Sequence, residues 1–174
     1  MWSTAADELA HGLRPVPSGP AYRVNSPPAN APVTQELSAE LARVLERFAK
    51  DSGFSEQRPV HIQFGQGTVG HHQAGRAADI YGVEGIGIEK WKARWDAKLG
   101  LARRAEQRHA PARQERHSNL GWRLYKALQV YGYWTQPYGY PIQLFGPWTR
   151  EEGPWKYISD VLLAAHGDHI HVAK

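Results

Sequence analysis

The sequence predicts an α+β domain with long irregular segments, and three observations lead to this expectation. A length of 174 residues fits one domain best. Hydrophobic residues make up 41% of the chain and include seven tryptophans, so there is enough apolar material for a core, and disorder is disfavoured. The 17 glycines and 12 prolines predict extensive loops between helical and strand-like segments.

The first 33 residues are expected to form an extended arm that wraps the domain, or a linker, and the domain itself is expected to span residues 34–174. Six prolines lie between Gly12 and Val33, a composition typical of extended chain. The first residues contain no apolar stretch of the signal-peptide type. The sequence therefore leaves the route of export open.

The first half of the domain is expected to contain two helices and two strands. One helix is predicted by apolar residues that recur on a single helical face, namely Leu37, Leu41, Val44, Leu45 and Phe48. Gly53 is expected to stop this helix. Residues 59–64 alternate in polarity and predict a strand, and residues 75–81 predict a second one. The spacing of Trp91, Trp95 and Leu99 predicts another helix between residues 88 and 101.

The second half is expected to begin with a charged stretch, residues 103–116, that forms a solvated helix end or a loop. Ser118 is expected to cap a helix that Gly132 closes. Residues 133–147 are rich in aromatic side chains, which would line a groove for peptides or sugars or would simply pack in the core. Pro154 is expected to open a last helix, and residues 169–172 are expected to form the final strand.

The residue types exclude several classes of protein. Cysteine is absent, so the chain forms no disulfide, and any transition-metal site must use histidine, aspartate or glutamate. No segment approaches the roughly 20 apolar residues of a membrane span. The formal net charge of +4 is a mild bias toward anionic partners, either nucleic acid or the carboxylates and phosphates of a bacterial wall.

Five of the nine histidines lie in two short clusters that are far apart in the sequence. Their polar members are His71, His72 and Asp79 in the first cluster and His166, Asp168, His169 and His171 in the second. Side chains alternate between the two faces of a strand, so His169 and His171 are expected to share one face while Ile170 and Val172 face the core. Gly75 is expected to turn the backbone between His72 and Asp79.

A metal site is the chemistry that these clusters favour. One histidine and one aspartate from the first cluster, together with a distant histidine, would offer two nitrogens and one oxygen. This donor set suits Zn²⁺, with the fourth position left to water.

The two clusters resemble the metal-binding motifs of the LAS-type zinc metallopeptidases. This superfamily includes D-Ala-D-Ala peptidases, phage L-alanyl-D-glutamate endolysins, penicillin-insensitive murein endopeptidases and the zinc domain of hedgehog proteins. The segment from His72 to Asp79, with its internal Gly-x-Ala-x-Asp, is similar to their His-x6-Asp motif, and His169-Ile170-His171 is similar to their closing His-x-His. The wider spacing His166-x-x-His169-x-His171 is most similar to the murein endopeptidase branch.

This resemblance, which covers about residues 35–174, implies a zinc-dependent hydrolase that cleaves peptidoglycan peptides. The family fold is a small antiparallel sheet with flanking helices and long loops. By the same resemblance, the zinc ligands are His72, Asp79 and His171. The catalytic residues that do not bind the metal would be His166, Asp168 and His169.

The chain departs from the family pattern in ways that leave the mechanism open. Gly70 stands where many members have serine, and Asp168 stands where carboxypeptidase members carry a catalytic glutamate. Either His166 or Asp168 is therefore expected to be the general base, and His169 is expected to donate to the oxyanion. No arginine lies between residues 59 and 72 to bind a free carboxylate. An endopeptidase is therefore expected in preference to a D,D-carboxypeptidase.

Several alternatives stay open on the sequence. They are a D,D-carboxypeptidase, a phage-type L-alanyl-D-glutamate endolysin, a non-enzymatic hedgehog-like zinc module and, least favoured, a basic nuclease. The enzyme would act in the periplasm, or would be secreted or delivered to the cell wall, as a remodelling enzyme, an endolysin or an antibacterial toxin. The expected partners are peptidoglycan peptides, with an immunity or delivery protein in the case of a toxin. A monomer that binds no nucleic acid is expected.

Overall fold

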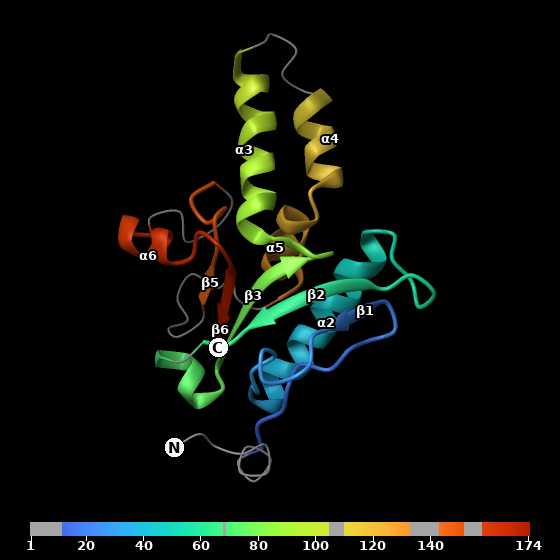
Figure 1. Ribbon diagram of the computed structural model, residues 1–174, viewed down its shortest axis with the longest axis vertical. Coiled ribbons are helices and arrows are strands. Elements are labelled where there is room, and N and C mark those ends of the chain that lie inside the picture. Colours follow the sequence, from blue (N-terminus) through green and yellow to red (C-terminus); the bar gives the residue numbers. More distant parts are fainter. Residues whose placement is uncertain (1–11, 68, 105–109, 133–142, 152–157) are drawn as a thin grey trace.

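One mixed sheet of six strands organises the computed structural model, which describes residues 12–67, 69–104, 110–132, 143–151 and 158–174 (Figure 1). The strands are β1 (Tyr22–Val24), β2 (Val60–Gly65), β3 (Ala77–Val83), β4 (Ile86–Gly87), β5 (Gln143–Phe145) and β6 (Ile170–Ala173). Their order in the sheet is β1-β2-β3-β6-β5, and β4 pairs with β3. The predicted α+β class is confirmed, although the sheet is not wholly antiparallel, because β1 runs parallel to β2.

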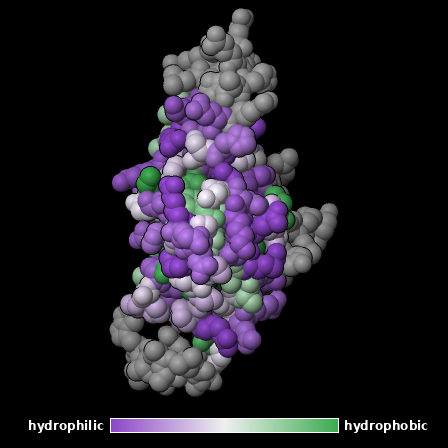
Figure 2. Space-filling view, turned by 90° about the vertical axis from the view of Figure 1, so that its right-hand side faces the viewer, coloured by the Kyte–Doolittle hydropathy of each residue, from purple (hydrophilic) through white to green (hydrophobic). Residues whose placement is uncertain are grey.

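The helices are α2 (Gln35–Asp51), α3 (Ile88–Arg104), α4 (Ala110–Ser118), α5 (Leu120–Tyr131), α6 (Asp160–Ala165) and the short 3-10 helix η1 (Gly70–Ala74). Helices α2 and α5 pack together behind the sheet, and α3 and α4 extend beyond it as a pair (Figure 1). The core lies between the sheet and these helices and includes Leu41, Leu124 and Ile170. The face seen in Figure 2 is mostly hydrophilic, with only small hydrophobic areas. In the described part of the chain, no helix is both long and apolar enough to cross a membrane.

The first predicted helix is confirmed as α2, and its start has a clear cause. The side chain of Thr34 accepts a hydrogen bond from the backbone N–H of Leu37 and caps the helix. The apolar face that defined the periodicity is buried, with Leu41 and Val44 both at 0% exposure. Burial of this face against the sheet and α5 stabilises the helix.

The arm before α2 is joined to the sheet. β1 pairs in parallel with β2, and the backbones of Arg14 and Val33 exchange two hydrogen bonds of 2.8 Å. Val16, Tyr22 and Val33 are buried at 1% exposure or less. Residues 12–33 therefore contribute side chains to the same core as the rest of the domain.

The charged stretch and the cap that follows it differ from the sequence prediction. Residues 110–118 form the helix α4, which packs against α3. Asn119, and not Ser118, caps α5, since its side chain accepts a hydrogen bond from the N–H of Trp122 at 2.9 Å. Asn119 is fully buried and also donates to Glu115 and to the carbonyl of Trp91. Tertiary contacts with α3 thus decide the position of the cap.

The last part of the chain adds β5 and α6. β5 lies inside the aromatic-rich stretch of residues 133–147, and Phe145 from this stretch and the adjacent Trp148 are buried. The expected groove residues between 133 and 142, and the expected helix start at Pro154, lie outside the described residues. Within the described part, α6 begins after Ser159, whose side chain accepts a hydrogen bond from the N–H of Leu162.

Candidate metal centre

The centre of the site lies on a row of paired residues that crosses four strands of the sheet. Gly65 on β2 is paired with Asp79 on β3, Asp79 with His171 on β6, and His171 with Phe145 on β5. Residues directly opposite each other on paired strands project to the same face. Asp79 and His171, which are far apart in the sequence, therefore meet because their strands are neighbours.

The alternation predicted for the last strand is confirmed. Ile170 and Val172 are at 0% exposure in the core. His169 and His171 are each 7% exposed and lie outside the core cluster, next to Asp79. The strand itself begins at Ile170, so His169 stands immediately before β6.

Helix η1 brings His72 to this row from outside the sheet. Gly75 ends η1 in the left-handed conformation, with φ at 66°, and its N–H donates to the carbonyl of His72 at 3.0 Å. Such a conformation favours glycine, so the predicted turn between His72 and Asp79 is confirmed. The turn leaves His72 Nε2 at 3.2 Å from Asp79 Oδ2.

His72, Asp79 and His171 are close enough together to share one ion. His171 Nδ1 lies 2.8 Å from Asp79 Oδ1, and one ligand atom from each of the three residues lies within 4.8 Å of the others. Two ligands at about 2.1 Å from a tetrahedral zinc ion are roughly 3.4 Å apart. The observed spacing therefore fits a metal ion with only small adjustments.

Hydrogen bonding around His171 also fits a cation. Its Nε2 lies 3.2 Å from Gln143 Oε1, an acceptor, so Nε2 carries the hydrogen. Nδ1 faces the carboxylate of Asp79, a second acceptor, so either a proton or a metal ion lies between them: the proton gives the hydrogen bond from His171 to Asp79, and a metal ion would replace it. In the described part of the chain, the cationic partners of Asp79 are imidazoles alone. The cluster is a candidate metal centre.

The carboxyl group of Asp79 is held in its ionised form. Burial alone would raise its pKa, but hydrogen bonds and charge interactions with His171 and His72 outweigh burial and hold the pKa well below the ordinary aspartate value. Asp79 is 4% exposed. An ionised, buried carboxylate with imidazole neighbours is a suitable ligand for a divalent cation.

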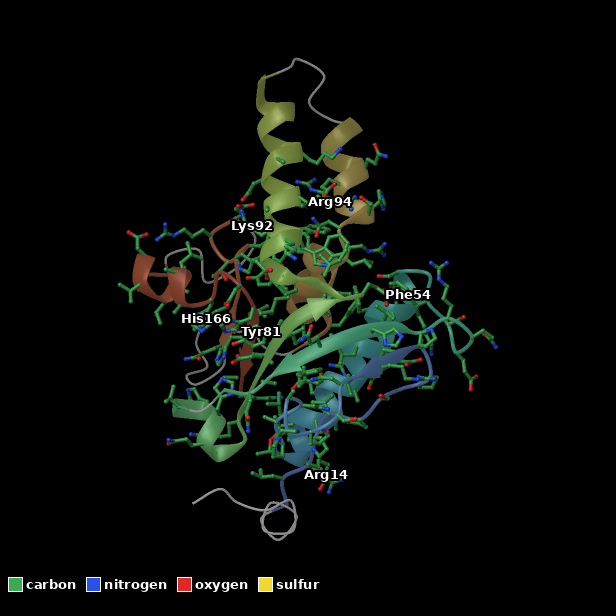
Figure 3. The ribbon with its side chains drawn as sticks, viewed as in Figure 1. Arg14, Phe54, Tyr81, Lys92, Arg94 and His166 are labelled. Carbon is green, nitrogen blue, oxygen red and sulfur yellow. The ribbon has the colours of Figure 1, made fainter. Side chains whose placement is uncertain are left out.

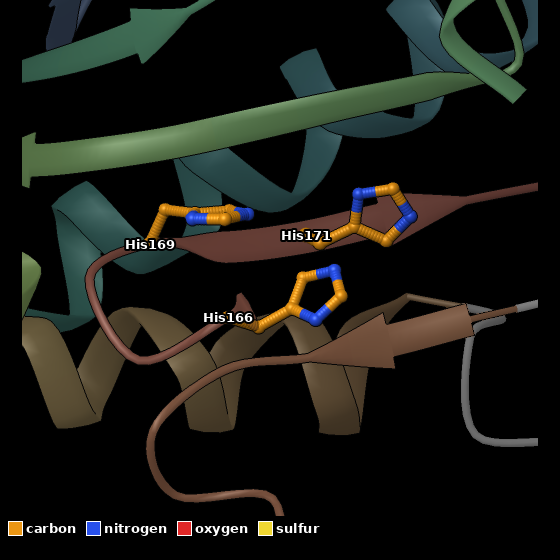
Figure 4. Close-up of side chains that lie close together, drawn as sticks. All are labelled: His166, His169 and His171. Atoms are coloured by element: carbon orange, nitrogen blue, oxygen red, sulfur yellow. The ribbon is translucent and has the colours of Figure 1, made fainter. Parts of the chain in front are cut away.

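Two further imidazoles adjoin the same centre. The ring of His166 lies 5.1 Å from the rings of both His169 and His171, measured between centroids (Figure 4). His166 Nδ1 lies 2.7 Å from the carbonyl oxygen of Leu162, so Nδ1 carries the hydrogen and Nε2 keeps a free lone pair. Burial lowers the pKa of His166, and the neighbouring His171 and His169 add to this, although the bond to Leu162 opposes it. His166 is therefore a neutral proton acceptor near pH 7.

His169 is held by groups on both sides. Its Nδ1 lies 2.7 Å from Asp168 Oδ1, and its Nε2 lies 3.7 Å from Asp79 Oδ1. The ring of Tyr81 stacks on the ring of His169, with 4.8 Å between the centroids. Tyr81 and His166 are both labelled in Figure 3, which shows them in the same part of the molecule. The side chain of Asp168 is 62% exposed. Asp168 therefore joins the site through its bond to His169.

The structure thus brings five of the six predicted site residues into one cluster and connects Asp168 at its edge. His71, the other histidine of the first cluster, is partly buried, and its Nδ1 has no hydrogen-bond partner in the described part of the chain. Two neighbours of the site were missed. Tyr81 was open to prediction, because it lies two residues after Asp79 on a predicted strand and therefore on the same face. Gln143 had no signal, since the stretch of residues 133–147 was distinguished only by its aromatic side chains.

Comparisons with protein-family models, curated proteins and solved structures give no match. The assignment of the metal centre therefore depends on the geometry described above.

Gln143 supplies a test of that geometry. Replacing it with leucine should remove the acceptor that orients His171, and loss of such a supporting group typically weakens metal binding by about 10–100-fold. We expect zinc affinity, measured by competition with a chelator, to fall by about 10-fold. Gln57→Leu, on an exposed loop before β2, is the matched control. Equal affinity in both variants would contradict the orienting role of Gln143.

Proposed function

We propose that this chain is a zinc-dependent peptidoglycan hydrolase that cleaves stem or cross-link peptides as an endopeptidase. The observation that carries the proposal is the meeting of His72, Asp79 and His171, with His166 and His169 beside them. The substrate class is inferred from the resemblance of the two motifs to those of the metallopeptidases. Asp79 and His171 belong to different motifs and are 92 residues apart in the sequence, yet they are bonded to each other in the fold. Because the proposed substrate is peptidoglycan, we infer that the enzyme acts at the cell wall, in the periplasm or outside the cell.

Zinc is the proposed metal because two imidazoles and one carboxylate, without a thiolate, form a donor set of catalytic zinc sites. When bound there, the ion would lower the pKa of its water to about 7 and polarise the scissile carbonyl. The residues that would hold it are His72, Asp79 and His171.

His166 is the proposed general base. Its Nδ1 is occupied by the carbonyl of Leu162, so Nε2 is the atom that would accept a proton from the attacking water. The same nitrogen would then give the proton to the leaving amine, because a peptide nitrogen departs only when it is protonated. Burial keeps the imidazole neutral and ready to accept.

His169 and Asp168 have a different proposed role. Asp168 binds Nδ1 of His169 and directs Nε2 toward the metal centre. Protonated on both nitrogens, His169 would donate through Nδ1 to Asp168 and through Nε2 to the carbonyl oxygen of the substrate, where negative charge develops in the transition state. Asp168 is a poorer candidate for the base, because its carboxylate is already bonded to His169 and is largely exposed.

The non-enzymatic zinc module is less well supported. Such a module needs no group for proton transfer beside the metal. Among the described residues, Nε2 of His166 has no hydrogen-bond partner, and the ring lies 5.1 Å from that of the proposed ligand His171. This arrangement favours an enzyme.

Arginine placement supports an endopeptidase. A carboxypeptidase must bind a free carboxylate, which arginine does best. Arg23 is bonded to the backbone carbonyls of Gly19 and Tyr22, and Arg123 is bonded to those of Asp51 and His117. Both are therefore engaged elsewhere in the fold.

A product assay with two substrates tests the choice of bond. We expect the zinc-loaded protein to cleave a cross-linked peptide dimer and to release no free D-Ala from an uncross-linked pentapeptide stem, with products identified by mass. The chelated protein is the control. Arg76, exposed beside His71, is another candidate for carboxylate binding, so Arg76→Ala should not reduce cleavage of the dimer. Release of D-Ala with the dimer intact would show a carboxypeptidase, and inactivity on both substrates would refute the peptidase.

A further inference from the structure

Two glycines, Gly65 at the end of β2 and Gly67 just after it, have rings of the site packed directly against their backbone. A Cβ atom built on Gly67 would lie 2.4 Å from Cγ, Cδ2 and Cε1 of His72. A Cβ atom on Gly65 would lie 2.2 Å from Cδ2 and Cε2 of Tyr81. Real Cβ atoms essentially never approach other heavy atoms closer than 3.0 Å. Each ring therefore occupies the space that a side chain would fill.

Glycine at positions 65 and 67 is explained by the lack of room for a side chain, and not by the backbone conformation. Neither Gly65 nor Gly67 has a φ angle in the left-handed region, whereas Gly75 does. An L-residue could adopt their backbone conformation, so what the two positions exclude is the side chain itself.

The position of Gly67 bears directly on the proposed ligand His72. This histidine comes from η1, outside the sheet, and its side chain is only 9% exposed. Its ring lies against the backbone of Gly67 with Nε2 at 3.2 Å from Asp79. A side chain at position 67 would push the ring out of this position.

The position of Gly65 bears on a different ring. Gly65 is paired with Asp79 in the sheet, and Tyr81 lies over it. Tyr81 in turn stacks on His169. Gly65 therefore supports the histidine proposed to contact substrate, and not a proposed metal ligand.

We propose that Gly67 is a positioning residue of the metal centre, which sets zinc affinity by leaving room for the imidazole of His72, and that Gly65 positions Tyr81 and through it His169. This inference rests on the proposed zinc site but not on the bond that the enzyme cleaves. Because each clash is with a side-chain ring and not with backbone, alanine at either position is expected to displace the ring.

The test compares Gly67→Ala, Gly65→Ala and the control Gly146→Ala, whose added Cβ would be no closer than 3.4 Å to any neighbour. We expect zinc binding by Gly67→Ala to weaken by about 10–100-fold, the usual cost of disturbing the support of a ligand. Gly65→Ala and Gly146→Ala should bind zinc as the wild type does. In the metal-free proteins, the imidazole NMR signals of His72 should shift in Gly67→Ala alone.

A stability cycle gives a second measurement that needs no metal. In a His72→Ala background the ring is absent, so adding Gly67→Ala should cost less stability than it costs in the wild type, as measured by denaturant unfolding. An equal cost in both backgrounds would show that the ring is not what Gly67 accommodates. Unchanged zinc affinity together with unchanged His72 signals would likewise overturn the proposal.

The outcomes separate this inference from the proposed enzyme function. A wild-type protein that binds zinc but cleaves no peptide would refute the peptidase, while the Gly67 effect on zinc affinity could still be observed. A wild-type protein that binds no zinc would refute both. A peptidase whose zinc affinity is insensitive to Gly67→Ala would refute only the inference drawn from the glycines.

Discussion

The Asp79→Ala variant is expected to lose stoichiometric zinc, whereas the wild type should hold one Zn²⁺ per chain. Asp79 is the one anionic member of the proposed ligand set and bonds to both His72 and His171. Without it, two imidazoles remain and the charge that balances the cation is gone. The loss should exceed the roughly 10–100-fold that removal of a supporting group costs.

Elemental analysis after dialysis, followed by calorimetric titration, measures this effect. Asp79→Asn retains the shape of the side chain but not its charge, and we expect it to lose zinc as well. Asp96→Ala is the control, because Asp96 is exposed on α3 and pairs with Lys92. A folded wild-type protein that takes up no zinc would refute the metal centre and the enzyme proposed from it.

The second large effect is expected for His166→Ala, which should lower kcat by about 10²–10⁴-fold while zinc stays bound. The proposed base is removed, but the three proposed ligands remain. Asp168→Ala should reduce kcat less, because Asp168 acts through the orientation of His169. Activity on a cross-linked peptide dimer and zinc content should be measured on the same samples.

His117→Ala is the matched control for this experiment, since His117 is exposed at the end of α4. If Asp168→Ala were the more damaging variant, with zinc retained, Asp168 would be the base and His166 a supporting residue. Near-full activity in both variants would contradict the proposed proton transfer altogether.

Local patterns in the sequence predicted the main elements because their signals need no distant partner. The apolar face of α2 repeats with helical spacing, and Ile170 and Val172 alternate with the histidines of β6. Both patterns report which side of an element is buried, and both were confirmed. Gly75 was predictable for a similar reason, since a sharp turn between His72 and Asp79 favours glycine.

Other elements depended on neighbours that the local pattern does not contain. α4 is rich in charged residues, yet Glu115 is 2% exposed because Arg94 and Asn119 bind its carboxylate. The same buried contacts make Asn119 the cap of α5 in place of the adjacent Ser118. β5 is a strand of three residues that pairs with β6, and so short a strand has almost no periodicity of its own.

The sequence by itself determined the residue types of the candidate site, their two motifs and the face of β6 on which the histidines lie. Only the tertiary structure decided that β3 and β6 are neighbours, so that Asp79 stands opposite His171. It also placed Gln143 against His171 and the backbone of Gly67 beneath His72. The physical reason is that periodicity records the burial of a side chain, whereas strand pairing and ring packing depend on which distant segments come into contact.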